Sequence, residues 1–305
     1  MSQPHNHQHA HDPHGHDHPM PGQGRAFGIG IVLNLSFVII EAYYGWVTGS
    51  LALLADAAHN LGDVGGLLLA WAAFAAARLQ PSDSKTYGWR RGSILASFVN
   101  AIILLVAMGS LGWEAIQRFQ EPAPIAAGTV MIVAAIGVGI NTATALLFMA
   151  GRKQDLNIRG AFLHMAADAL VSLGVVVAGA LYLWQGWTWI DPVASLIIAF
   201  VVIVGSWSLF RQSLHLLFDG VPEHIKLPEV RDCLQAIPGV ISVHDLHVWA
   251  MSTAEPALTA HLVTSTERSA NDILHEAQRV LHERFNIEHV TLQIEAEACA
   301  AACAE

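Results

Sequence analysis

The chain has 305 residues, of which 53% are hydrophobic and 13% charged, and its formal net charge is −10. This composition is too apolar for an ordinary soluble protein of this length, and it indicates a membrane protein. The acidic balance argues against a basic surface for nucleic acid, so no such partner is expected. Most of the excess acidic residues lie after residue 210, which predicts a membrane part followed by a separate soluble domain.

Residues 1–25 form a polar segment in which histidines recur among Pro, Asp and Gly. These histidines are His5, His7, His9, His11, His14, His16 and His18. We expect a disordered cytoplasmic tail that concentrates metal ions, although a flexible linker or a cloning remnant would share this composition.

Between residues 26 and 210, six apolar runs reach the roughly 20 residues that a helix needs to cross a bilayer. They are Ala26 to Thr48, Leu51 to Ala77, Ser93 to Phe119, Ala127 to Ala150, Gly160 to Trp184 and Ile190 to Phe210. The loops after the second and fourth runs are rich in Lys and Arg, which predicts that these loops and both termini are cytoplasmic. Trp184, Trp187 and Trp189 indicate the opposite interface with lipid.

Two of the predicted spans carry the same His-x-x-x-Asp pattern, His59 with Asp63 and His164 with Asp168. Residues four apart share one face of a helix. Two such helices facing each other supply two imidazoles and two carboxylates, a set suited to tetrahedral Zn²⁺. One pair alone would be explained equally well by a hydrogen bond between packed helices. Ionisable groups at membrane depth cost roughly 2.5 to 3.5 kcal/mol each, so two matched pairs predict a metal site.

Other polar residues in the spans are candidates for a cavity beside the metal. Asp56 continues the stripe of His59 toward the helix start, where it would either support the site or simply be a polar helix end. Glu41, Asn34 and Asn141 are expected to line the same hydrated cavity, although hydrogen bonds between helices would also explain the asparagines.

Asp and His ligands release an ion more readily than Cys ligands, which argues against a structural site. A histidine nitrogen binds a metal or a proton but not both, so the two compete for one site. If the site opens alternately to the two sides of the membrane, this competition becomes exchange of metal for protons.

Residues 211–295 are predicted to form a small α+β domain of the ferredoxin-like type, followed by a tail over residues 296–305. The expected order is a helix over Pro228 to Ile237, strands over Val240 to Ala250 and Ala257 to Thr264, a helix over Ser269 to Phe285 and a strand over Ile287 to Glu295. Cys299 and Cys303 in the tail are either an additional thiolate pair or part of a disordered end. Asp219 follows the sixth span, where Arg90 or Arg91 would reach it and form a hinge ion pair.

Two segments identify a family resemblance. The segment from Thr48 to Asn60, TGSLALLADAAHN, resembles the second-helix signature of the cation diffusion facilitators, and Val243 to Trp249, VHDLHVW, resembles the signature of their cytoplasmic domain. The resemblance implies a homodimer that exports Zn²⁺ from the cytoplasm by proton antiport. His59, Asp63, His164 and Asp168 match the transport ligands of the zinc-exporting branch. The short loop between the fourth and fifth spans favours a bacterial cytoplasmic membrane.

The resemblance also implies a metal site in the cytoplasmic domain, with His244, His261 and Glu295 as ligands. His275 and Gln293 are weaker candidates, and His247 is a lesser one, because three positions along a regular strand put it on the opposite face from His244.

The residues leave other functions to consider. A membrane metalloenzyme would use the same four ligands, but they leave no position open for water. A metal sensor or storage protein would use the histidines without needing six spans. Two His and two Asp accept Cd²⁺, Co²⁺ or Ni²⁺ as well as Zn²⁺, so the sequence leaves the physiological ion open.

Overall fold

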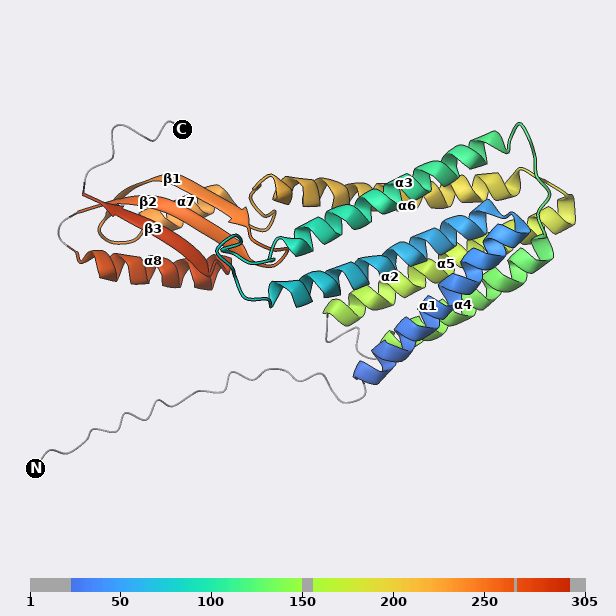
Figure 1. Cartoon of the computed structure of the whole chain (residues 1–305), viewed down its shortest axis with the longest axis horizontal. Helices are drawn as coiled ribbons and strands as arrows, with labels where there is room; N and C mark the ends of the chain where they lie inside the picture. Colours follow the sequence, from blue (N-terminus) through green and yellow to red (C-terminus); the bar gives the residue numbers. More distant parts are fainter. Residues whose placement is uncertain (1–22, 150–155, 266–267, 297–305) are drawn as a thin grey trace, which may run out of the picture.

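The computed structural model describes residues 23–149, 156–265 and 268–296, which form a long helical bundle and a small C-terminal domain (Figure 1). The bundle consists of α1 (Gln23–Thr48), α2 (Leu51–Ala77), α3 (Gly92–Gln117), α4 (Ala127–Met149), α5 (Leu156–Gln185) and α6 (Ile190–Leu217). The His-rich tail and the pair Cys299 and Cys303 lie outside the described residues.

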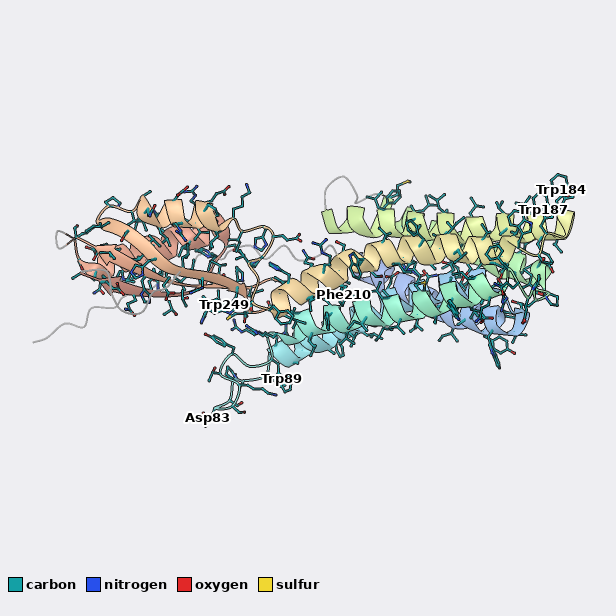
Figure 2. All side chains as sticks on the ribbon, turned by 90° about the horizontal axis from the view of Figure 1, so that it is seen from above. Asp83, Trp89, Trp184, Trp187, Phe210 and Trp249 are labelled. Atoms are coloured by element: carbon teal, nitrogen blue, oxygen red, sulfur yellow. The ribbon has the colours of Figure 1, made fainter. Side chains whose placement is uncertain are left out.

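Within the described residues, the five helices α2 to α6 contain stretches long and apolar enough to cross a membrane. Large apolar side chains cover the outside of the bundle, as lipid contact requires: Trp71 is 70% exposed and Phe200 is 68% exposed. Trp184 and Trp187 stand at the end of the bundle far from the C-terminal domain (Figure 2). The predicted membrane bundle is confirmed.

The spans agree with the sequence prediction to within three residues, except at two ends. Helix α6 continues to Leu217, beyond the predicted end at Phe210, and α5 begins at Leu156 rather than Gly160. The additional residues of α6 include Arg211 and Gln212, which are good helix formers. Hydropathy marks the edge of the lipid, and the helix itself continues into water.

Helix α2 occupies the centre of the bundle, where it packs against α1, α3, α5 and α6. Helix α4 packs along α5, and α3 packs along α6. Buried residues such as Leu53 and Ala55 of α2, Met108 of α3 and Val202 of α6 belong to one core. This arrangement places the middle of α2 beside α5.

The C-terminal domain contains α7 (Leu227–Gln235), β1 (Val240–Ala250), β2 (Pro256–Thr264), α8 (Ala270–Phe285) and β3 (His289–Glu295). The sheet has the order β1-β2-β3, with β1 antiparallel and β3 parallel to β2. Helices α7 and α8 contribute to one core through Leu234, Ile273 and Leu281, which pack with Leu258 and Leu262 of β2. This is the predicted α+β fold, and its opposite sheet face carries histidines.

Candidate metal transport site

The structure brings the two predicted His-Asp pairs together. The Nε2 atom of His59 lies 3.6 Å from Asp63 Oδ2 and 3.5 Å from Asp168 Oδ1. The Nε2 atom of His164 lies 3.3 Å from Asp63 Oδ2 and 3.7 Å from Asp168 Oδ2. Each imidazole therefore approaches carboxylates from both α2 and α5.

These distances suit one shared cation. Two ligand atoms at 2.0 to 2.2 Å from a tetrahedral Zn²⁺ are about 3.3 to 3.6 Å apart. The four measured nitrogen–oxygen distances of 3.3 to 3.7 Å are close to that separation. The Oδ2 atom of Asp63 is buried and has no hydrogen-bond partner within the described residues, so it has a lone pair to offer.

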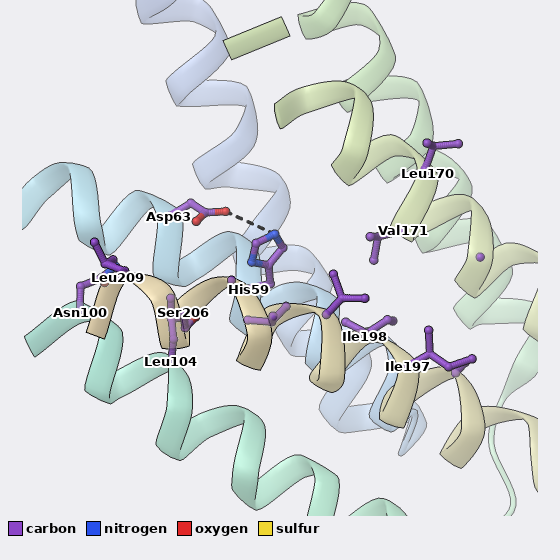
Figure 3. Close-up of a pocket in the computed structure, with 15 residues that line it drawn as sticks. His59, Asp63, Asn100, Leu104, Leu170, Val171, Ile197, Ile198, Ser206 and Leu209 are labelled. Carbon is purple, nitrogen blue, oxygen red and sulfur yellow. Dashed lines mark ion pairs between the residues drawn. The ribbon is translucent and has the colours of Figure 1, made fainter. Parts of the chain in front are cut away.

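The four side chains differ in burial. Asp168 is 3% exposed, whereas Asp63 is 31% and His164 is 42% exposed. His59 and Asp63 line a cavity of about 620 Å³ between α2, α3, α5 and α6. Its remaining wall includes Asn100 and Ser206 but is mainly apolar (Figure 3). The cavity therefore reaches two of the four residues of the cluster.

Glu41 and Asp56 lie in a buried polar network rather than among the residues that line this cavity. Asn60 Nδ2 lies 3.3 Å from Glu41 Oε2 and 3.5 Å from Asp56 Oδ1. Ser172 of α5 donates a 2.8 Å hydrogen bond to Asp56 Oδ2. The network links α1, α2 and α5 next to the four His and Asp residues.

The two asparagine candidates also lie away from the cavity wall. Asn34 Nδ2 contacts the Met165 sulfur at 3.3 Å, directly beside His164. The amide of Asn141 is buried and has no hydrogen-bond partner within the described residues.

Sequence reasoning missed Asp191, which joins α6 to the first turn of α2. Its carboxylate accepts hydrogen bonds from Ser50 Oγ at 2.5 Å, Leu51 N at 2.9 Å and Ala52 N at 3.4 Å. Arg118 Nη1 lies 3.8 Å from its Oδ2 atom. An acidic residue beside the tryptophans at the start of a span was the available signal, but its partner lies 140 positions away along the chain.

A second cluster lies on the open face of the C-terminal sheet. His244 pairs directly with His261 across β1 and β2. Glu295 Oε2 lies 3.1 Å from His244 Nε2, and Glu295 Oε1 lies 3.0 Å from His261 Nδ1. One ligand atom from each of the three residues fits within a mutual distance of 4.8 Å. The structure therefore brings together the three main cytoplasmic candidates.

The lesser cytoplasmic candidates are distributed differently. The expectation that His247 faces away from His244 is wrong, because a register shift between them places both on the open face. His247 Nε2 lies 2.9 Å from Asp245 Oδ1, and this hydrogen bond holds the pKa of Asp245 below its usual 3.8. Gln293 donates to Glu295 Oε1 at 2.8 Å. His275 is exposed on α8, which covers the opposite face of the sheet, so the fold separates it from the cluster.

The two parts of the protein meet at charged contacts. The sequence predicted that Arg90 or Arg91 would pair with Asp219, and the structure shows the ion pair with Arg91. Arg90 pairs instead with Glu255, at 3.3 Å. The backbone N–H of Thr253 donates to Ser93 Oγ at 3.1 Å. The tip of the β1–β2 hairpin therefore touches the start of α3.

The chain combines a helical membrane bundle, which carries imidazoles and carboxylates inside two helices, with a following α+β domain. This combination defines a class of multi-pass membrane proteins with a candidate cation site. The cation efflux transmembrane domain model matches residues 28–218, and the model of the cytoplasmic domain of cation efflux proteins matches residues 222–297. The chain belongs to this cation efflux family, the cation diffusion facilitators, as its signatures predicted.

Several known proteins are similar to this chain over most of its length and most of their own. A cadmium, cobalt and zinc/H(+)-K(+) antiporter of Bacillus subtilis is 35% identical over 88% of this chain and 87% of the relative. The zinc transporter ZitB of Escherichia coli is 37% identical over 86% of this chain and 84% of the relative. The metal cation efflux system protein CzcD of Cupriavidus metallidurans is 36% identical over 88% and 85%. A solved structure, the metal-bound C-terminal domain of CzcD, is 40% identical, with a TM-score of 0.23, and covers 23% of this chain and 99% of that chain.

Proposed function

We propose that this protein exports divalent metal ions, above all Zn²⁺, from the cytoplasm in exchange for protons. His59, Asp63, His164 and Asp168 are the proposed ligands of the transported ion. The observation that carries the proposal is that the Nε2 atom of each imidazole lies within 3.3 to 3.7 Å of carboxylates from both helices. The cadmium and cobalt in the name of the Bacillus subtilis relative support Cd²⁺ and Co²⁺ as further substrates, and the donor set also accepts Ni²⁺.

The cavity provides the proposed path for the ion. Its lining on α6 runs from Ala194 to Leu209, toward the end of the bundle that meets the C-terminal domain. An ion entering there would meet Asp63 and His59, which line the cavity wall. Protons that bind to the histidines would displace the ion, because a protonated imidazole nitrogen is no longer a ligand.

Vesicles that contain the purified protein test this function. A zinc dye and a pH dye inside the vesicles should report opposite movements of Zn²⁺ and protons. The name of the Bacillus relative also contains K⁺, so replacing K⁺ outside the vesicles tests K⁺ as a second counter-ion. Asp63→Ala and Asp168→Ala should abolish the zinc flux. Asp83→Ala, in the exposed loop between α2 and α3, is the matched control and should retain it. Undiminished flux in both site variants would contradict the assignment.

We also propose that the protein is a homodimer in a bacterial cytoplasmic membrane, surrounded by lipid, with both termini in the cytoplasm. Two observations support this orientation: Arg90 pairs with Glu255 of the C-terminal domain, and Trp184 and Trp187 stand at the far end of the bundle (Figure 2). Labelling of single cysteines introduced at Asp83 and Gly186 from the two sides of the membrane tests the orientation. Light scattering of the purified protein tests the dimer.

A regulatory or structural Zn²⁺ on the C-terminal sheet is the second part of the proposal. Two imidazoles and the carboxylate of Glu295 match the chemistry of a zinc site, and His261 Nδ1 is a buried nitrogen without a well-aligned hydrogen bond among the described residues. His244, His261 and Glu295 would hold the ion and would fix β1, β2 and β3 to one another. The metalloenzyme and sensor alternatives are not favoured, because the relatives named above are transporters.

A further inference from the structure

Asp245 has an unusual position in β1. Its backbone is left-handed, with a φ of 50°. Asp219 has a similar backbone, with a φ of 58°. His244 pairs with His261 and His247 pairs with Thr259, so β1 uses one more residue than β2 between these pairs. This bulge places Asp245 between two histidines of the open face.

The His261 ring lies between two carboxylates. Its Nδ1 atom is 3.0 Å from Glu295 Oε1, and its Nε2 atom is 3.5 Å from Asp245 Oδ2. The other oxygen of Asp245 lies 2.9 Å from His247 Nε2. A neutral imidazole donates a hydrogen bond from one nitrogen and offers a lone pair at the other. The ring nitrogen that faces Asp245 is therefore the natural donor, and Nδ1 is the natural ligand.

We propose that Asp245 is a positioning residue that accepts the Nε2–H of His261 and thereby presents Nδ1 to the cytoplasmic cation. The inference rests on the proposed cation site of His244, His261 and Glu295. His247 holds the other oxygen of Asp245 and so fixes the direction of the carboxylate. A carboxylate behind a metal-binding histidine sets the orientation of the ring and increases the affinity for the ion.

A purely structural role for Asp245 is the competing explanation, because Asp tolerates the left-handed conformation that the bulge needs. The chain offers a matched control for this explanation. Asn286 also has a left-handed backbone, with a φ of 54°, at the end of α8 in the same domain. Glycine adopts that conformation without strain, so Asp245→Gly and Asn286→Gly make the same change of backbone residue at two positions.

The experiment uses the chain in detergent with Asp63→Ala and Asp168→Ala in place and with residues 1–22 deleted, so that the C-terminal sheet is the remaining proposed site. Zn²⁺ binding is measured by calorimetry, and Co²⁺ binding by its visible absorption. Asp245→Gly should lower the affinity about 10- to 100-fold. Asp245→Asn, which keeps an oxygen acceptor and the left-handed backbone, should lose less. Asn286→Gly should bind as the parent does.

A pair of substitutions at His261 tests which nitrogen binds. His261→Asn places an amide oxygen near the position of Nδ1, whereas His261→Gln places it near Nε2, so the Asn variant should bind Zn²⁺ more tightly than the Gln variant. Asp245→Gly should add no further loss to His261→Asn, because no ring is left to orient. An additive loss would overturn the proposal.

The outcomes separate the positioning role from the site itself. If Asp245→Gly and Asp245→Asn bind like the parent while His244→Ala abolishes binding, the site stands and the role of Asp245 is refuted. If His244→Ala and Glu295→Ala also bind like the parent, the proposed cytoplasmic site fails. If Asp245→Gly does not fold, Asp245→Asn decides, and an affinity equal to that of the parent refutes the positioning role.

Discussion

The contact between Asp191 and α2 allows a quantitative prediction. Replacing Asp191 by Ala removes the acceptor for Ser50 Oγ and for the backbone N–H groups of Leu51 and Ala52. Asp191 is 5% exposed and Arg118 is 15% exposed, so water replaces the lost contacts poorly. Hydrogen bonds to a charged group contribute about 1.5 to 3 kcal/mol each. Removing one partner from a buried ion pair costs about 3 to 5 kcal/mol, which we expect here.

Unfolding of the purified protein in increasing SDS, followed by circular dichroism, measures this loss. Asp191→Asn keeps one oxygen acceptor without the charge and should show an intermediate effect. Glu114→Ala is the matched control, because Glu114 is 49% exposed and also contacts Arg118, at 3.5 Å. This control should change the stability by about 0.5 kcal/mol or less. Equal stability of Asp191→Ala and Glu114→Ala would refute the reasoning.

Three further changes have defined outcomes. Asp219→Asn, which removes the charge and keeps a residue that tolerates the left-handed backbone there, should cost about 1 kcal/mol or less in thermal unfolding, because the carboxylate is 60% exposed; a larger loss would contradict this. Gly62→Ala should destabilise the bundle in SDS by about 1 to 3 kcal/mol, since its Cβ would lie 2.2 Å from Leu104 Cδ2, and the same change should cost less in a Leu104→Ala background. Carboxyl NMR should place the pKa of Asp245 below 3.8, because the hydrogen bond from His247 stabilises the carboxylate. The contribution of this hydrogen bond to folding stability is therefore lost only as the pH falls through that pKa. His247→Ala should raise the pKa of Asp245.

The sequence predicted the elements well because their signals are local. Apolar runs mark the spans, and the alternation around Val243 to Ala250 marks β1, whose bounds match the structure. The four transmembrane His and Asp residues were also predictable as a group, since the spacing of four fixes the face of each helix. Only the mutual approach of α2 and α5 required the three-dimensional structure.

The features that were missed depend on contacts between distant segments. The bulge at Asp245 is defined by the register of β2 against β1, so reading β1 alone gave the wrong face for His247. Asp191 acts on the start of α2 from another helix, which no local capping pattern reveals. Glu41 and Asp56 were recognised as polar residues in spans, but the link through Asn60 needed their arrangement in space.

The Asp191 contact and the cavity place two constraints on how α2 and α6 move. The helices are joined by Asp191 at the end far from the C-terminal domain, and the cavity separates them beside His59 and Asp63. Moving α5 along α2 by one residue, about 1.5 Å, would change the two nitrogen–oxygen distances that join these helices, 3.5 Å between His59 and Asp168 and 3.3 Å between His164 and Asp63, and would disturb the shared site. Release of the ion at the far end of the bundle therefore requires one of two movements. Either the hydrogen bonds of Asp191 to α2 break, or α2 and α6 move together against α5. A variant of Asp191 that binds Zn²⁺ normally but transports it slowly would identify the first route.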